Sequence, residues 1–154
     1  MEETFDIPGR VFDFNSDLNY GKKGEQLVSD FLDNLSNGDF EVKSDRYRNG
    51  RMVVETDQNP RGRIDANGNQ VWVKSGINIT TARWWVYIYS PEGAFIVVDV
   101  GRLKRYLRSN RHKFNDSTKI NLGWSDNPAK GFLLMPEDVI DMLINPNYDS
   151  PNGK

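Results

Sequence analysis

Residues 40–57 read FEVKSDRYRNGRMVVETD, and the spacing of their charges sets the expectation for the whole chain. Phe40 to Asp45 is predicted to be a β-strand, with Glu41, Lys43 and Asp45 at alternate positions. Alternate side chains of a strand point to the same face of the sheet. We therefore expect these three charged groups to lie together on one face.

Asn49-Gly50 favours a tight turn, so the strand predicted at Met52–Asp57 is expected to return antiparallel to the first. It brings a further carboxylate, Glu55. A plain two-residue turn pairs Asp45 with Val54 and leaves Glu55 on the opposite face from Asp45. An odd loop or a β-bulge places both carboxylates on one face, and this is the arrangement we expect.

Carboxylates and a lysine gathered among apolar residues indicate a divalent-metal site that hydrolyses phosphodiester bonds. Mg²⁺ keeps most of its waters and needs only one or two protein carboxylates. A neighbouring lysine orients or deprotonates water and stabilises negative charge. We predict Asp45 and Glu55 as metal ligands and Lys43 as the group that acts on water. Glu41 assists, and Glu25 completes the shell through water.

The composition is that of one globular domain with a modest core. The chain has 154 residues, a net charge of -2 and no cysteine, which excludes disulfides and thiolate metal sites. No apolar run reaches the roughly 18 residues of a membrane span, and the N-terminus lacks the pattern of a signal peptide. A cytoplasmic protein without a membrane partner is expected.

Positive charge is concentrated in the middle of the chain. Residues 42–113 hold fourteen Lys or Arg against six acids, a balance of +8, whereas residues 1–41 hold three against ten. Nucleic-acid binding follows such local patches rather than the overall charge. A charge run is also common on a plain solvated helix face, but here no acid interrupts it. The residues predicted to contact DNA phosphates are Arg46, Arg48, Arg102, Lys104, Arg105, Arg108, Arg111 and Lys113. The single histidine, His112, lies in the same run and is expected at the surface.

Hydrophobic periodicity predicts an irregular arm at 1–20, a single domain at 21–145 and a mobile tail at 146–154. The domain begins with a helix that Asn37-Gly38 ends. The predicted order is helix, hairpin, strand, short helix, strand, strand, helix and helix. This order favours an α/β (α+β) fold with a mixed central sheet flanked by helices.

Four segments together resemble the PD-(D/E)XK nuclease superfamily, in particular small phage-encoded endonucleases and Holliday-junction resolvases. They are GKKGEQLVSDFL, EVKSD, VVET and SGINITTARWWVYI, and the resemblance covers roughly residues 21–107. It implies a restriction-endonuclease-like core, cleavage of DNA with Mg²⁺ or Mn²⁺, and a homodimer.

The chain departs from the superfamily pattern, which is an Asp followed about ten or more residues later by Glu-x-Lys. Two positions after Glu55 stands Asp57 and not a lysine. Glu41-Val42-Lys43 is an alternative Glu-x-Lys, for which only Asp39 can serve as the preceding Asp. A second hypothesis is therefore a non-catalytic nucleic-acid-binding or assembly module that retains the nuclease fold.

Overall fold

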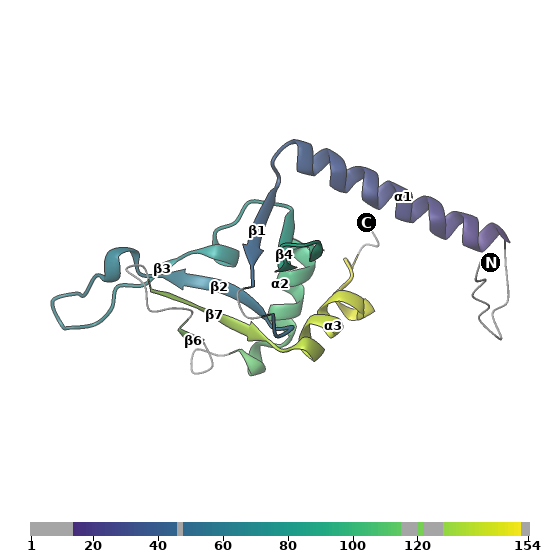
Figure 1. Ribbon diagram of the computed structural model, residues 1–154. Coiled ribbons are helices and arrows are strands. Elements are labelled where there is room, and N and C mark those ends of the chain that lie inside the picture. The colour runs from purple at the N-terminus through teal and green to yellow at the C-terminus, as the bar shows by residue number, and fades with distance from the viewer. Residues whose placement is uncertain (1–13, 46–47, 115–119, 122–127, 152–154) are drawn as a thin grey trace. The chain divides into compact units, whose positions relative to one another are not determined.

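The computed structural model describes residues 14–45, 48–114, 120–121 and 128–151 (Figure 1). By its internal contacts the chain divides into two units, residues 1–37 and residues 38–154. The first contains one helix and the second contains all the strands. Each unit is described by itself below.

The helix of the first unit, α1, spans Phe14–Ser36 and starts seven residues before the expected position. The segment 14–20, predicted as part of an irregular arm, is therefore helical. Gly21 was expected to mark the boundary, but a glycine inside a helix costs only about 1 kcal/mol and does not end it. The predicted end is confirmed, because Gly38 adopts a φ of +73° directly after the last turn. The prediction that this helix flanks a sheet stays open.

The first sheet of the second unit has the order β1-β4-β5. It consists of β1 (Phe40–Ser44), β4 (Trp84–Ser90) and β5 (Ala94–Asp99). β1 runs parallel to β4, and β4 and β5 form an antiparallel hairpin. β4 is the central strand and is buried along its first half, as expected for a strand with two neighbours.

The second sheet is antiparallel with the order β3-β2-β7-β6. Its strands are β2 (Met52–Gln58), β3 (Val73–Lys74), β6 (Ile120–Asn121) and β7 (Ala129–Leu134). A short 3-10 helix, η1 (Pro60–Gly62), lies in the connection from β2 to β3.

The predicted hairpin within Phe40–Asp57 is wrong, although both of its strands are present. β1 pairs with β4, and β2 pairs with β3 and β7 in the other sheet (Figure 1). A type I′ turn needs a positive φ at both Asn49 and Gly50. Gly50 has a φ of +74°, but among the described non-glycine residues only Arg48 and Arg61 have a positive φ. The single central sheet is likewise replaced by two small sheets, and the fold is mixed α and β.

The hydrophobic core joins both sheets to two helices. α2 (Val100–Ser109) follows β5 directly, and the Asp99 carboxylate accepts a hydrogen bond from the Arg102 backbone N–H at 3.1 Å. α3 (Pro136–Ile144) begins at Pro136, whose fixed φ suits the first position of a helix. The buried cluster takes residues from β2, β4, β7, α2 and α3, among them Met52, Trp85, Tyr87, Leu103, Leu134 and Met142.

The segment after α3 is packed where the sequence predicted a mobile tail. Pro146–Tyr148 forms a 3-10 helix, η4, and Tyr148 is only 7% exposed. Its ring lies edge-on to Tyr106 of α2, with 5.1 Å between ring centroids. Among the described residues, no helix has the length and apolar character needed to cross a membrane.

Candidate functional site

The charged face predicted for β1 is present. In the parallel ladder Glu41 is level with Trp85 and Lys43 is level with Tyr87, and both of these β4 residues are buried. Glu41, Lys43 and Asp45 are all partly buried, whereas the two residues between them are exposed. The three charged groups therefore share the face of β1 that borders the buried aromatic side chains.

Glu41 and Lys43 form an ion pair on this face. The Lys43 Nζ lies 2.8 Å from the Glu41 Oε1 and 5.7 Å from the centroid of the Trp85 ring. Partial burial raises the pKa of Glu41, but hydrogen bonds from Lys43 and Thr80 and the charge of Lys43 outweigh it. The net pKa of Glu41 lies below its ordinary value of 4.5, so this group is a carboxylate at neutral pH.

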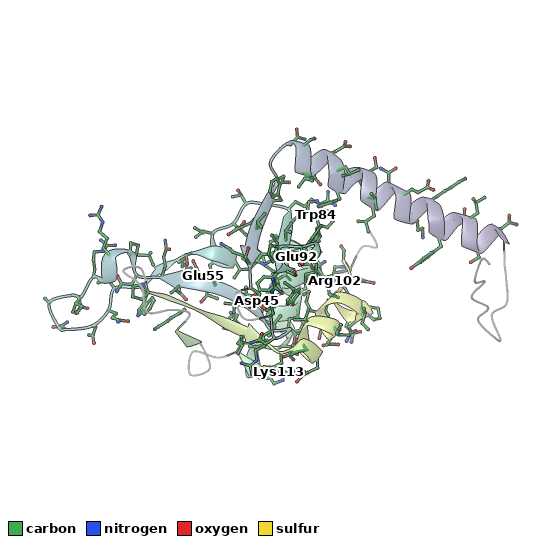
Figure 2. The ribbon with its side chains drawn as sticks, viewed as in Figure 1. Asp45, Glu55, Trp84, Glu92, Arg102 and Lys113 are labelled. Atoms are coloured by element: carbon green, nitrogen blue, oxygen red, sulfur yellow. The ribbon has the colours of Figure 1, made fainter. Side chains whose placement is uncertain are left out.

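Asp45 lies in a different environment, just beyond the end of β1 (Figure 2). Its backbone N–H donates to the Ile88 carbonyl at 2.8 Å, and its carboxylate lies close enough to Tyr87 and Tyr89 to affect their ionisation. Burial raises the pKa of Tyr89 to about 12, and interactions with Tyr87 and Asp45 add to the effect. Asp45 is four residues from Glu41, which corresponds to roughly 13 Å along a strand.

Glu55 lies on β2 and is held by a serine from the following connection. Its Oε1 accepts a hydrogen bond of 2.7 Å from the Ser75 Oγ. Gly76, which follows Ser75, has a φ of +50°. A Cβ added to Gly76 would lie 2.2 Å from the Glu55 carbonyl oxygen. Only glycine fits this contact. β2 also has a bulge between Glu55 and Asp57, where it pairs with β7. The sequence predicted a bulge or an odd loop between the strands at Phe40–Asp45 and Met52–Asp57 instead.

Segment 75–80 connects the surroundings of Glu55 and Glu41. It contains the 3-10 helix η2 (Gly76–Asn78). Gly76 packs on Glu55 and also lines a pocket of about 350 Å³ with Asp39, Glu41 and Thr80. We call this space the carboxylate pocket. Glu41 and Glu55 thus approach the same short segment from two different sheets.

The donors around the carboxylate pocket suit a cation that keeps most of its waters. Asp39, Glu41 and Thr80 line the pocket, and they carry the hard oxygen donors that Mg²⁺ prefers. Glu55 and its partner Ser75 adjoin Gly76, another lining residue. Within the described part of the chain, no three His, Cys, Asp or Glu residues form a cluster able to hold a metal ion. The lining therefore fits an ion with one or two carboxylate ligands rather than a closed protein cage.

The roles of all the predicted site residues stay predictions, and this applies most plainly to Glu25, Arg46 and Arg48. Glu25 is an exposed residue of α1 and belongs to the other unit. Arg46 lies outside the described residues. Arg48 is exposed and has a φ of +48°, which an arginine rarely adopts.

The arginines on one side of α2 bind the protein's own carbonyl groups. Arg102 donates to the Met142 and Asn145 carbonyls, both at 2.7 Å, and forms an ion pair with Asp149 (Figure 2). Arg105 donates to the Tyr148 carbonyl at 2.7 Å. These two side chains attach α2 to the end of α3 and to η4, and their contact with DNA phosphates stays a prediction.

The opposite side of α2 lines a larger cavity of about 810 Å³. Lys104, Arg108 and Arg111 follow one another at helical spacing, and His112 joins them from the 3-10 helix η3 (Arg111–Lys113). The apolar part of the lining consists of Ile77, Leu107, Phe114 and Phe132. None of the described lining residues is acidic. We call this space the basic cavity.

Lys113, the last predicted phosphate contact, is exposed and lies 3.4 Å from Asp138 of α3, between its Nζ and the Asp138 Oδ1. Six of the eight predicted DNA contacts thus fall into two groups: Arg102, Arg105 and Lys113 have partners within the protein, and Lys104, Arg108 and Arg111 share one cavity.

No family model matches the chain, and neither a curated protein nor a solved structure matches it significantly. The resemblance to the nuclease superfamily therefore rests on the motifs quoted above.

Sequence reasoning missed the part that segment 75–80 plays. The sequence indicates only a simple turn at Ser75-Gly76, yet Ser75 binds Glu55 and Gly76 packs on it. The available signal was the glycine beside a hydroxyl residue within an apolar stretch. The spacing of Lys104, Arg108 and Arg111 was a second signal, because it places these cations on one side of the helix and Arg102 and Arg105 on another.

Proposed function

We propose that this protein is a Mg²⁺- or Mn²⁺-dependent DNA endonuclease that hydrolyses phosphodiester bonds. Its core would be of the restriction-endonuclease-like type, and its substrate duplex or branched DNA such as a Holliday junction. Phage origin and action as a homodimer are part of the same proposal, and both follow from the motif resemblance alone.

One observation carries the proposal: Glu41 with its partner Lys43, and Glu55 with its partner Ser75, both border segment 75–80. The sequence favoured Asp45 and Glu55 as the two metal ligands. The geometry supports Glu41 and Glu55 better, since Asp45 lies beside Tyr87 and Tyr89. This choice also agrees with the alternative in which Glu41-Val42-Lys43 is the Glu-x-Lys motif.

A divalent ion bound at this pocket would supply a polarised water and neutralise charge on the phosphoryl oxygens. Glu41 and Glu55 would hold it as carboxylates, and the low pKa of Glu41 keeps that group ionised at neutral pH. The Lys43 ammonium group, held by Glu41 and the Trp85 ring, would orient the attacking water and stabilise the pentacovalent phosphate.

The test is cleavage of linear, supercoiled and four-way-junction DNA in Mg²⁺, Mn²⁺ or EDTA. Glu41→Gln, Glu55→Gln and Lys43→Met should each lower the cleavage rate by about 100-fold or more. Glu92→Gln, in the exposed turn between β4 and β5, is the matched control and should cleave at the normal rate (Figure 2).

Asp45→Asn separates the two possible ligand sets. If Glu41 and Glu55 are the ligands, this variant keeps most of its activity and its metal affinity. Loss of activity in Asp45→Asn with full activity in Glu41→Gln would show that Asp45 and Glu55 are the metal ligands, as the sequence favoured. Normal cleavage by both Glu55→Gln and Glu41→Gln would refute the proposal.

The alternative is a DNA-binding or assembly module without catalysis. Two observations favour it: three carboxylates do not cluster in the described residues, and the basic cavity offers cations for binding. DNA binding that persists in EDTA, without cleavage in either metal, would support the module in place of the enzyme.

A further inference from the structure

The basic cavity lies between α2, η3 and the sheet that contains β2 and β7. Its lining comes from separate parts of the second unit: Thr56 of β2, Ile77 of η2, side chains of α2 and η3, Phe114, and Phe132 of β7. Elements distant in sequence therefore build one concave space. Its volume of about 810 Å³ falls within the roughly 300–1,000 Å³ that is usual for small-molecule sites.

Among the residues that the structure describes, no carboxylate neutralises the cations of this cavity. Lys104, Arg108 and Arg111 form no ion pair with any described residue. Arg108 makes one long hydrogen bond of 3.3 Å, from its Nε to the Lys104 carbonyl of its own helix. Like charges that share a cavity repel one another, and an anion would relieve that repulsion. This arrangement contrasts with Arg102 of the same helix, whose guanidinium group binds two backbone carbonyls and Asp149.

The cavity also has an apolar part, which a bare inorganic anion would leave unfilled. Phe114 and Phe132 lie with their ring centroids 5.3 Å apart, and Ile77 and Leu107 are almost fully buried beside them. A ligand that fills this space has a planar or apolar body joined to an anionic group. Guanidinium groups bind phosphate with paired hydrogen bonds, and aromatic side chains stack on bases.

We infer that the basic cavity binds one nucleotide through its phosphate monoester. Arg108 and Arg111 hold the phosphate with Lys104, and the base lies against Phe114 and Phe132. The nucleotide is either a free nucleoside monophosphate or the phosphorylated end of a DNA strand. This site is distinct from the carboxylate pocket, so the inference goes beyond the proposed cleavage and does not require it.

Segment 75–80 gives the two sites a common wall. Gly76 and Thr80 line the carboxylate pocket, whereas Ile77 and Asn78 line the basic cavity. A strand whose terminal nucleotide occupies the cavity would therefore lie against the segment that Glu41 and Glu55 adjoin. In that case the cavity selects strand ends, a substrate feature that the proposed cleavage leaves open.

Isothermal titration calorimetry of the full chain in EDTA tests the inference without any cleavage. The ligands are dAMP, deoxyadenosine, inorganic phosphate, and a short single strand with and without a 5′-phosphate. We expect dAMP to bind at least about tenfold more tightly than either deoxyadenosine or inorganic phosphate. Arg108→Gln and Arg111→Gln should each weaken dAMP binding at least about tenfold. Arg63→Gln, an exposed arginine of the β2–β3 connection, is the matched control and should change it less than twofold.

Preference for the phosphorylated strand over dAMP assigns the cavity to DNA ends, and the opposite preference assigns it to free nucleotides. Equal binding of dAMP and deoxyadenosine would overturn the inference, as would dAMP binding that both arginine variants retain. DNA cleavage that survives loss of dAMP binding leaves the proposed function intact. Nucleotide binding without cleavage in Mg²⁺ would support this inference and contradict the enzyme.

Discussion

The carboxylate pocket and the basic cavity are lined by different residues of segment 75–80, and they differ in whether their charged groups have partners. In the pocket, Glu41 is paired with Lys43, and Glu55 accepts a hydrogen bond from Ser75. In the cavity, three cations of α2 and η3 line one space without a carboxylate partner among the described residues. The pocket has compensated charge of both signs, whereas the cavity has an excess of one sign.

This difference shows why a count of charges does not locate a site. Arg102 and Arg108 belong to the same helix, and the sequence predicted the same role for both. Arg102 donates to two backbone carbonyls and forms an ion pair with Asp149. Arg108 instead lines the basic cavity. A cation contributes to binding only when the fold leaves its donors to a ligand.

The largest effect is expected from Gly76→Ala, which disturbs the segment shared by both sites. The new Cβ would lie 2.2 Å from the Glu55 carbonyl oxygen, and the positive φ adds backbone strain. Strain and overpacking together should lower the free energy of unfolding by about 2–5 kcal/mol, as measured by urea denaturation. Gly68→Ala is the matched control, because Gly68 has a φ of +80° and a Cβ added there would meet no heavy atom within 4 Å. If both variants lose the same stability, the close packing of Gly76 on Glu55 is unimportant.

Arg102→Met should have the next largest effect, because it removes a side chain whose partners are already in place. The Met142 and Asn145 carbonyls and Asp149 lose their common donor. We expect the free energy of unfolding to fall by about 2–3 kcal/mol, the range for hydrogen bonds to a charged group. Thermal or urea unfolding measures it. Unchanged stability would show that these contacts of Arg102 do not stabilise the fold, as is expected of the uncompensated cations of the basic cavity.

A smaller effect is expected from Lys43→Met, and it depends on pH. In the native protein the pKa of Glu41 is lower in the folded state than its ordinary 4.5. The ion pair therefore stabilises the fold above about pH 4.5, and this contribution disappears as the pH falls through the lower, folded pKa. Its size should be about 0.5 kcal/mol for a partly exposed pair.

Without Lys43, burial is the main remaining influence on Glu41 and acts to raise its pKa. The variant should therefore lose most stability at neutral pH and little at pH 3, which urea denaturation across this range measures. Lys74→Met, in an exposed position of β3, is the control and should show no such pH dependence. A loss that is equal at pH 3 and pH 7 would mean that Lys43 stabilises the fold through packing alone.

The smallest effect, with the opposite sign, is expected from Arg108→Gln. Removal of one cation from the basic cavity relieves repulsion, so the free energy of unfolding should stay constant or rise by up to about 0.5 kcal/mol. Added phosphate should stabilise the native chain more than this variant, which melting temperatures in phosphate and in chloride of equal ionic strength reveal. Destabilisation as large as that of Arg102→Met would show that Arg108 is structural.

Local patterns predicted much of the chain. The periodicity of Leu103, Tyr106 and Leu107 indicated the buried side of α2, and Gly38 and Pro136 marked the end and start of two helices. Such features depend on residues within a few positions of one another, and one sequence contains that information. The common face of Glu41, Lys43 and Asp45 was predictable for the same reason, since it follows from the two-residue period of a strand.

Pairing between distant elements was not predictable in this way. Asn49-Gly50 favoured a hairpin, but β1 gains its backbone hydrogen bonds from β4, more than forty residues later. The free energy that selects β4 comes from burial of its aromatic side chains against both sheets, which no local signal contains.

By itself, then, the sequence determined the strands at 40–44 and 52–58, the charged face of the first, and the excess of cations along α2. Only the tertiary structure decided that Glu41 and Glu55 both adjoin segment 75–80, whereas Asp45 lies beside Tyr87 and Tyr89. It also decided which cations of α2 are used by α3 and η4 and which line a cavity. The physical reason is that side-chain type and periodicity are local properties of the sequence. The partners of each side chain come from elements distant in sequence, which only the folded structure brings next to it.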